Sequence, residues 1–323
     1  MANSALTYWQ AGLESTAGTP VAATRKIYEI GPIPSEQRML EYVRQSRQSF
    51  IENFDAVETA VKVEWEMEGV VNYSDLAWWA ELMWKGGVSP TGAGPYTRTY
   101  NGAGASDNLK SATFEVNDGV GSFRLPYTVC TAWELSGEGG GDKAGIVGLK
   151  TELLAQKLTA GHTMTASLAD RDLRGTYIPF VQTQFFINST AGTIGTTENG
   201  TLMKFTISGD NKVSPLYYGG DSGYFGATRR EKRYVEVALE ILFDSTSYAE
   251  FSTNFQTNAG RYCQIKCTSG TSSLTFNFYT KFEAFEYPED GPTRRVALLG
   301  RSIYDATLAY DWQAVLVNSV ATI

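Results

Sequence analysis

The stretch KVEWEMEGVV, residues 62–71, decides the fold class because acidic and apolar side chains alternate along it. The alternating positions are Val63, Trp65 and Met67 on the apolar side and Glu64, Glu66 and Glu68 on the acidic side. Successive side chains of a β-strand point to opposite faces, so the pattern predicts a strand with three carboxylates on one face. The apolar face has to be covered by a core, which predicts a sheet with one buried and one polar face.

The composition of the chain supports a β-rich globular protein. Its 323 residues correspond to about two domains of ordinary size. Hydrophobic residues make up 42% and aromatic residues 13% of the chain, which is enough to fill cores. The 32 glycines favour strands joined by turns over a helical bundle. The formal net charge of −8 argues against tight nucleic-acid binding, which needs clustered Lys and Arg to neutralise phosphates.

Cysteine spacing and hydropathy bear on the compartment. Cys130, Cys263 and Cys267 form no CxxC pair, so we predict buried thiols in a reducing compartment rather than a disulfide framework or a zinc site. The N-terminus lacks a basic segment followed by an apolar run, and no apolar stretch approaches the ~18 residues of a membrane helix. These patterns predict a soluble protein that is made in a cytoplasm and contacts no membrane.

Shifts in composition divide the chain into an arm and two β domains. Residues 1–25 are small, polar and marked by Gly and Pro, which predicts an N-terminal arm outside any core. Short alternating segments predict a first β domain over residues 26–170. Within it, YSDLAWWAELMW, residues 73–84, has helical spacing, with Ser74 as the expected N-cap. Residues 38–54 are compatible with either a helix or a long charged loop.

The second half of the chain repeats this plan, which predicts a second β domain over residues 171–323. The stretch VEVALEILF, 235–243, aligns without a gap with VEWEMEGVV, 63–71, so that Val235 corresponds to Val63. The acidic positions that the two stretches share are Glu64 with Glu236 and Glu68 with Glu240.

Two further similarities extend the repeat. SYAEFSTNFQ, residues 247–256, is helix-like and stands where the first predicted helix falls when the same alignment is continued. Residues 274–302 follow the order of features of residues 122–151, with alternating strands, an acidic turn and then aliphatic strands. We interpret the two halves as an internal duplication of a β-sandwich or β-barrel domain that carries one flanking helix.

The inventory of catalytic and ligand-binding groups is small. His162 is the only histidine, so a two-histidine metal site within one chain and an HExxH motif are both excluded. The run SGEGGGDKAG, 136–145, lacks the spacing of a phosphate-binding loop and stands between strand-like segments, which predicts a hairpin tip. Its candidate contact residues are Gly139, Gly140, Gly141 and Asp142. The sequence therefore predicts no catalytic residue, no cofactor and no metal.

The acidic strand allows three interpretations. Glu64 and Glu66 stand about 7 Å apart along one strand face, a spacing that a glycosidase could use. A glycosidase draws its acids from different strands around a cleft, however, so a regular row favours a surface. The row is then either an ordinary solvated face or the lining of an internal space.

Four motifs follow one another along the first hundred residues. The first is an N-terminal Glu followed by a Gly-Thr-Pro turn, carried by Glu14, Gly18, Thr19 and Pro20, and the acidic strand is the second. A Tyr-x-Asp-Leu helix start, carried by Tyr73, Asp75 and Leu76, and a GPYTRTY segment, 94–100, come next. In this order the motifs resemble those of the major tail tube proteins of long, non-contractile-tailed (siphovirus-type) bacteriophages.

The resemblance implies a structural, non-enzymatic virion protein that polymerises into stacked rings. The hollow tube would enclose a tape-measure protein, join tail-tip and tail-terminator proteins, and conduct viral DNA without binding it specifically. It would be assembled in the bacterial host cytoplasm, and duplication would give a trimeric, pseudo-hexameric ring. The residues expected to line the lumen are Glu64, Glu66, Glu68, Glu236 and Glu240, and those expected in an inter-ring or inter-subunit arm are Glu14, Gly18, Thr19 and Pro20.

An acidic lumen would repel the phosphates of passing DNA. The alternatives are a β-rich virion decoration or adhesion module that forms no tube, and a glycoside hydrolase. The first would show an exposed aromatic recognition patch. The second would lose turnover in Glu64→Gln or Glu66→Gln variants.

Overall fold

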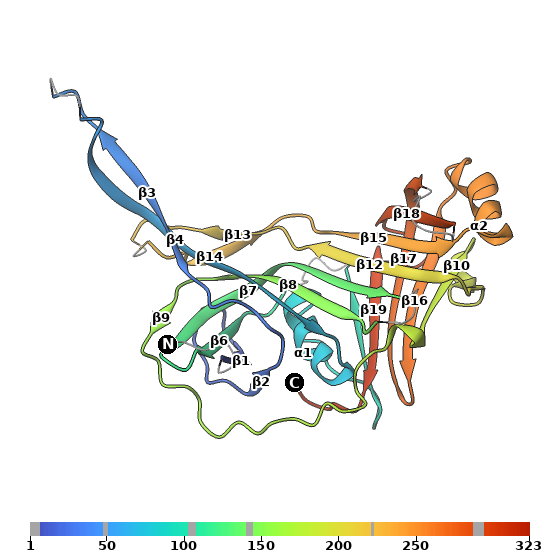
Figure 1. The fold of residues 1–323 in the computed structure, drawn as a ribbon, viewed down its shortest axis with the longest axis horizontal. Helices are drawn as coiled ribbons and strands as arrows, with labels where there is room; N and C mark the ends of the chain where they lie inside the picture. The colour runs from blue at the N-terminus through green and yellow to red at the C-terminus, as the bar shows by residue number, and fades with distance from the viewer. Residues whose placement is uncertain (1–6, 48–50, 103–107, 140–144, 221–222, 287–293) are drawn as a thin grey trace.

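The computed structural model describes residues 7–47, 51–102, 108–139, 145–220, 223–286 and 294–323 (Figure 1). The protein is mainly β, as predicted, and seventeen strands join into a single antiparallel sheet system. A separate two-stranded ladder, β13–β14, completes the β structure of these residues.

The first half contains most of the elements expected from its sequence. They are β1 (Tyr8–Leu13), β2 (Arg25–Ile27), β3 (Glu36–Arg44), β4 (Asn53–Val70), α1 (Tyr73–Met83), β5 (Tyr96–Asn101), β6 (Ala112–Asn117), β7 (Ser122–Glu138), β8 (Gly148–Ala155) and β9 (Thr159–Ala160). The alternation predicted around residue 65 is confirmed, because Val63, Trp65 and Met67 are buried while Glu64 and Glu66 are exposed.

The second half adds a similar series. Its elements are η2 (Phe180–Gln182), β10 (Thr183–Asn188), η3 (Ala191–Thr193), β11 (Glu198–Asn199), β12 (Leu202–Asp210), β13 (Val213–Leu216), β14 (Ala227–Arg230), β15 (Tyr234–Leu242), α2 (Ser245–Ala249), η4 (Glu250–Phe255), β16 (Arg261–Ser269), β17 (Ser272–Glu286), β18 (Arg295–Ser302) and β19 (Trp312–Asn318). The predicted second helix is present as α2 followed by the π-helical turn η4.

The strand pairings of the first half recur in the second. In the first half β1 pairs with β2 and β6, β6 with β7, β7 with β8, β8 with β4, and β4 with β3. In the second half β10 pairs with β11 and β16, β16 with β17, β17 with β18, β18 with β15, and β15 with β12. Irregularities recur too, between Cys130 and Ala132 in β7 and between Phe282 and Ala284 at the corresponding place in β17.

Two local predictions in the first half are wrong. Residues 38–54 form neither a helix nor a loop alone, because β3 and the start of β4 pair there as a long hairpin. The N-cap of α1 is Asn72 rather than Ser74. Asn72 has an extended backbone and its side chain accepts a hydrogen bond from the Asp75 N–H at 2.7 Å, while Ser74 is already inside the first turn.

The prediction that residues 1–25 lie outside any core is wrong for β1. This strand pairs with both β2 and β6, and its side chains Trp9 and Ala11 are buried. The Trp9 ring stacks on Trp65 with 6.2 Å between centroids, because alternation in YWQAGL supplies an apolar face that the polar composition of the segment obscured.

One hydrophobic core extends through both halves. Trp84, at the end of α1, contacts Trp133 of β7 at 5.7 Å and Phe276 of β17 at 6.2 Å between ring centroids. α1 therefore lies between the halves with nearly every side chain buried, whereas α2 lies at the far edge of the molecule (Figure 1). Each helix was expected to flank the sheet of its own half in the same way. The two differ, because the second half of the chain covers α1, whereas α2 has no such cover within the described residues.

Candidate functional site

The predicted acidic residues of the two halves lie on one face of one sheet. In the sheet, β4, β8, β7, β12, β15 and β18 are successive neighbours, and directly opposed residues point to the same face. One row of opposed residues crosses all of these strands and reaches β17. It consists of Glu68, Lys150, Glu134, Ser208, Glu236, Arg301 and Lys281.

This surface, here called the acidic face, has a clear excess of carboxylates from β4 to β15. The carboxylates are Glu64, Glu66, Glu68, Glu134, Glu138, Glu152, Asp210, Glu236 and Glu240, and the cations are Lys62, Lys150 and Lys204. Sequence reasoning found five of these acids. It missed the others because β7, β8 and β12 become their neighbours only when the sheet forms.

Ion pairs neutralise part of the charge on the acidic face, and the basic partners differ between the two halves. Lys150 binds Glu66 at 2.8 Å, and this hydrogen bond, with Glu152 and Glu134 nearby, raises the pKa of Lys150. In the second half, arginines of β18 bind both predicted acids. Arg301 lies 2.7 Å from Glu236, and Arg295 lies 3.4 Å from Glu240.

The environment of Glu64 and Glu66 does not resemble a catalytic pair. Glu64 binds Lys62 at 2.8 Å, Glu66 binds Lys150, and both carboxylates remain exposed. Catalytic acids are usually tuned by burial or by unequal surroundings, and these two share the same open surface. The geometry therefore fits a continuous charged wall.

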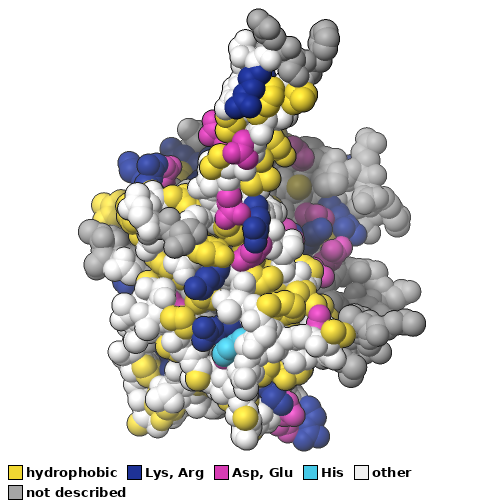
Figure 2. Space-filling model, turned by 90° about the vertical axis from the view of Figure 1, so that its left-hand side faces the viewer, with side chains coloured by type: hydrophobic (Ala, Val, Ile, Leu, Met, Phe, Trp, Pro, Cys, Tyr) yellow, Lys and Arg dark blue, Asp and Glu magenta, His cyan; other side chains and the backbone are white. Residues whose placement is uncertain are grey.

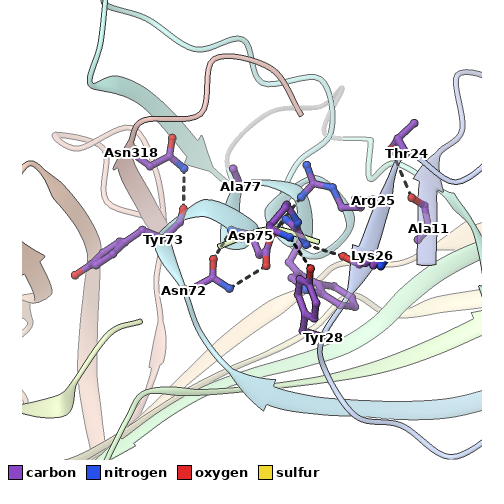
Figure 3. A network of polar contacts seen from close by, with 12 residues as sticks. Ala11, Thr24, Arg25, Lys26, Tyr28, Asn72, Tyr73, Asp75, Ala77 and Asn318 are labelled. Carbon is purple, nitrogen blue, oxygen red and sulfur yellow. Dashed lines mark hydrogen bonds and ion pairs between the residues drawn. The ribbon is translucent and has the colours of Figure 1, made fainter. Parts of the chain in front are cut away.

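A buried polar network fixes the start of α1 (Figure 3). Asp75 binds the guanidinium groups of Arg25, at 3.6 Å, and of Arg171, and it accepts a hydrogen bond from the Asn72 amide at 2.9 Å. Burial, with the nearby charge of Arg171, lowers the pKa of Arg25 to about 10. The Asn318 amide donates to the Tyr73 carbonyl at 2.7 Å, so the last strand is tied to the same helix.

Tyr73, Asp75 and Leu76, which carry the Tyr-x-Asp-Leu motif, thus have an internal role. Leu76 and Tyr73 are buried in the core, and Asp75 holds three segments together. Burying a charge is costly unless it is paired and hydrogen-bonded, and Asp75 meets both conditions.

Glu14 is buried within its own chain. Its carboxylate accepts hydrogen bonds from the Gly18 and Tyr127 N–H groups, at 2.8 and 2.9 Å, and from the hydroxyls of Ser111 and Thr113, at 2.7 and 2.8 Å. Within this chain Glu14 therefore has an internal role, which is to anchor the turn, and a contact of it with another subunit stays a prediction.

The rest of that turn is on the surface. Gly18, at a φ of 79°, rests on the Tyr127 ring, while Thr19 and Pro20 are exposed. A side chain on Gly18 would be strained in this conformation. The contact expected of Thr19 and Pro20 with another subunit stays a prediction.

The predicted loop tip is only partly described. The Gly139 N–H donates to the Met203 carbonyl at 2.7 Å, and a Cβ on Gly139 would lie 2.4 Å from the Phe180 ring. Gly139 therefore packs within the chain. Gly140, Gly141 and Asp142 lie outside the described residues.

His162 pairs with a buried carboxylate. Its Nε2 lies 3.0 Å from Glu115 Oε1, and Glu115 also accepts from the Thr165 N–H at 2.8 Å. Burial opposes ionisation of Glu115, but the bonds from Thr165, Gln10 and His162 outweigh it and lower its pKa. The cluster ties residues 162–165 to β6 and β1.

The cysteines are free and buried, as predicted, and burial raises the pKa of Cys267 to about 11. Within the described ranges, no group of three or more His, Cys, Asp or Glu is placed to hold a metal ion. None of the helices in those ranges has the length and apolar character needed to cross a membrane.

A group of exposed apolar residues belongs to a feature that sequence reasoning missed. The β3–β4 hairpin stands off the body (Figure 1), and hydrophobic side chains lie along its described part (Figure 2). Met39, Leu40, Tyr42 and Val57 on it are between 42% and 57% exposed. An isolated two-stranded hairpin is marginally stable in water, so this surface points to a partner.

A family model described as "Phage tail tube protein" matches residues 4–314 of the chain. The chain belongs to this family. No curated protein matches the sequence. Tail tube proteins are structural components of the virion tail, so the chain is a phage structural protein by family. The resemblance drawn from Glu14, the acidic strand and the helix start is thereby confirmed at the level of the tail tube.

Proposed function

We propose that the protein assembles into rings that stack into the hollow tube of a long, non-contractile phage tail, with the acidic face toward the lumen. The observation that carries this proposal is the continuity of the acidic face across both halves of the chain. A single chain then contributes one uninterrupted section of wall, and that wall repels the phosphates of viral DNA in transit.

Three chains form each ring in this proposal. The recurrence of the strand pairings and of the bulge supports an internal duplication, in which each half takes the place of one subunit of a six-membered ring. The tube encloses the tape-measure protein, meets the tail-tip and terminator proteins at its ends, and is assembled in the cytoplasm of the bacterial host.

The exposed ends of the sheet favour assembly over a free monomer. The β3–β4 hairpin lies at one end of the molecule, and β17, β18 and α2 lie at the other (Figure 1). Contacts between unlike ends form closed rings when the rotation closes.

Electron microscopy of the purified protein, with and without a tape-measure fragment as template, tests the proposal. We expect hollow tubes with three chains per ring. Rings of six chains would contradict the duplication argument alone, and a protein that forms no tube under either condition would contradict the function.

A further inference from the structure

The outer part of the β3–β4 hairpin has a counterpart elsewhere in the chain, the β13–β14 hairpin. Both are antiparallel ladders, and their registers correspond position by position over four successive pairs. The corresponding pairs are Leu40↔Glu58 with Val213↔Arg230, Glu41↔Val57 with Ser214↔Arg229, Tyr42↔Ala56 with Pro215↔Thr228, and Val43↔Asp55 with Leu216↔Ala227.

The β13–β14 hairpin is covered by the first half of its own chain. The Val61 N–H donates to the Gly223 carbonyl at 2.8 Å, and the Tyr217 hydroxyl donates to the Val61 carbonyl at 3.1 Å. Phe225 is fully buried, with its ring 5.2 Å from that of Tyr127. This hairpin therefore has the partner that the β3–β4 hairpin lacks.

A strand ladder leads into that contact. β12, which precedes β13, pairs with β7 with Asp210 opposite Ala132, and the Asn211 N–H then donates to the Thr131 carbonyl at 2.8 Å. On this edge of β7, β6 pairs with residues up to Thr128 and β12 with the remainder.

Among the described strands, none occupies the corresponding edge in the second half. β16 pairs with β17 only up to Thr280, and β18 occupies the other edge of residues 280–286. The β16-side edge of residues 281–284 therefore has no described strand beside it. Within the same set of strands β3 pairs with β4 alone, so its outer edge is open in the same sense. Open edges of this kind are templates for pairing with another chain.

We propose that β3 of one copy adds to this edge of β17 in a second copy, as β12 adds to β7, and that its hairpin then covers the second half of that copy. The inference rests on the proposed ring and names the contact that closes it.

The two correspondences between the halves set the register of the added strand. Continuing the hairpin correspondence back along the chain matches Asp210 with Gln37, and the shared bulge matches Ala132 with Ala284. Because Asp210 opposes Ala132, the added strand places Gln37 opposite Ala284 and Arg38 opposite Glu283.

This register also keeps the acidic face on one side of both copies. Gln37 lies opposite Lys62 and shares the acidic face, and Ala284 lies opposite Leu299 on that same face. The acidic face therefore continues from one copy to the next, whereas a slip by one residue would turn it over. The pairing also sets the exposed side chains of Arg38 and Glu283, which have opposite charge, beside each other.

The receiving surface carries two exposed apolar residues where the hairpin would lie. In the first half, Gln156 donates to the Phe225 carbonyl at 2.7 Å and Lys157 lies 5.7 Å from the Tyr224 ring, so both hold the covered hairpin. Their counterparts by the correspondence of β8 with β18 are Ile303 and Tyr304, which are 39% and 59% exposed. Exposed Ile and Tyr match the apolar side chains of the free hairpin.

Disulfide trapping tests the pairing. The test mixes full-length Gln37→Cys protein with full-length Ala284→Cys protein under tube-forming conditions, with diamide as the oxidant. A disulfide needs Cβ atoms within about 4.5 Å, so we expect a covalent species of twice the chain mass. The three natural cysteines are buried and contribute little background.

The matched control pairs Gln37→Cys with Glu283→Cys, an exposed position one residue away at the bulge of β17. We expect about ten-fold less covalent dimer from this pair, because Glu283 stands opposite Arg38 rather than Gln37 in the proposed register. Tubes without the Gln37–Ala284 dimer would overturn the pairing and leave the tube function intact. A dimer without tubes would support the pairing and contradict the tube, and the absence of both would overturn both.

A further substitution removes the apolar contact of the hairpin and leaves the two engineered cysteine positions unchanged. Leu40→Asp should abolish the covalent dimer while leaving the thermal midpoint of the monomer unchanged, because Leu40 is exposed within its own chain. Val120→Asp, at a side chain 74% exposed outside the hairpin, is the matched control and should leave the dimer yield unchanged. An undiminished dimer in Leu40→Asp would overturn the coverage of the hairpin.

Discussion

The β13–β14 hairpin and the outer β3–β4 hairpin have the same register and different surroundings. The first is packed on β4, β7 and β8 of its own chain, and the second extends into solvent with apolar side chains exposed (Figure 1). The difference teaches that hairpin geometry is local, whereas the stability of a hairpin depends on what covers it. In this chain the first half covers the β13–β14 hairpin, and in our proposal a second copy covers the β3–β4 hairpin.

The largest effect is expected from the covered hairpin. Phe225→Ala removes a fully buried ring that packs on Tyr127, which should lower the free energy of unfolding by about 3–5 kcal/mol. Phe54→Ala, in the free hairpin, should lower it by less than ~1 kcal/mol in the monomer. Urea denaturation of both variants measures the difference. Equal losses would show that the free hairpin is also packed against the monomer.

The next effect concerns a buried acid that only the first half has. Glu115 stands opposite Arg124, and the matching position in the second half, opposite Phe276, is Ile265. Because the folded state lowers the pKa of Glu115, its contribution is present above the ordinary value of 4.5 and is lost as the pH falls through the lowered pKa.

Glu115→Gln should therefore destabilise the protein by about 1–3 kcal/mol at pH 7 and lose less stability between pH 5 and pH 3 than the parent. Denaturation at a series of pH values measures this. An unchanged slope in the variant would assign the acid sensitivity to other carboxylates. Ile265 cannot titrate, so the strand that corresponds to β6 in the second half adds no such dependence at this position.

A smaller effect on stability is expected from substitutions in the two acidic strands, β4 and β15, and its size should differ between them. Replacing Glu64, Glu66 and Glu68 by Lys should cost no more than ~1 kcal/mol per position, because the ion pairs of Glu64 and Glu66 are exposed. Replacing Glu236 and Glu240 by Lys should cost more per position, since these carboxylates are less exposed and Arg301 and Arg295 would face like charges there. Thermal denaturation ranks the two sets.

The same two sets of Glu→Lys variants test whether the acidic face lines the lumen. Tubes of either set should retain DNA, with retention that falls steeply as salt is added, and should hinder its passage in a reconstituted particle. Unchanged infectivity with intact tubes would place the acidic face on the outside of the tube.

The smallest effect is expected at the position where the halves differ in the acidic row. Ala238 stands where the first half has Glu66, and it faces Thr206 and Leu299 on neighbouring strands. Ala238→Glu should change the free energy of unfolding by less than ~0.5 kcal/mol, because the position is a partly exposed surface site. A loss of several kcal/mol in thermal denaturation would show that this face is buried in the monomer.

The sequence alone determined the features that depend on periodicity. Alternation in KVEWEMEGVV fixed which side of β4 is buried, and helical spacing placed α1 to within one residue of its end. The order of motifs also indicated the tail tube family before any contact was known. These features are local, so the residues that cause them are neighbours in the chain.

Only the tertiary structure decided which distant segments meet. The polar composition of residues 1–25 concealed that β1 pairs with β6 and that Glu14 binds Ser111 and Thr113, far along the chain. Likewise, Glu68 and Glu236 share a row because β8, β7 and β12 lie between their strands. Strand pairing across long stretches of chain is set by the burial of a common core, and no local pattern specifies the partner.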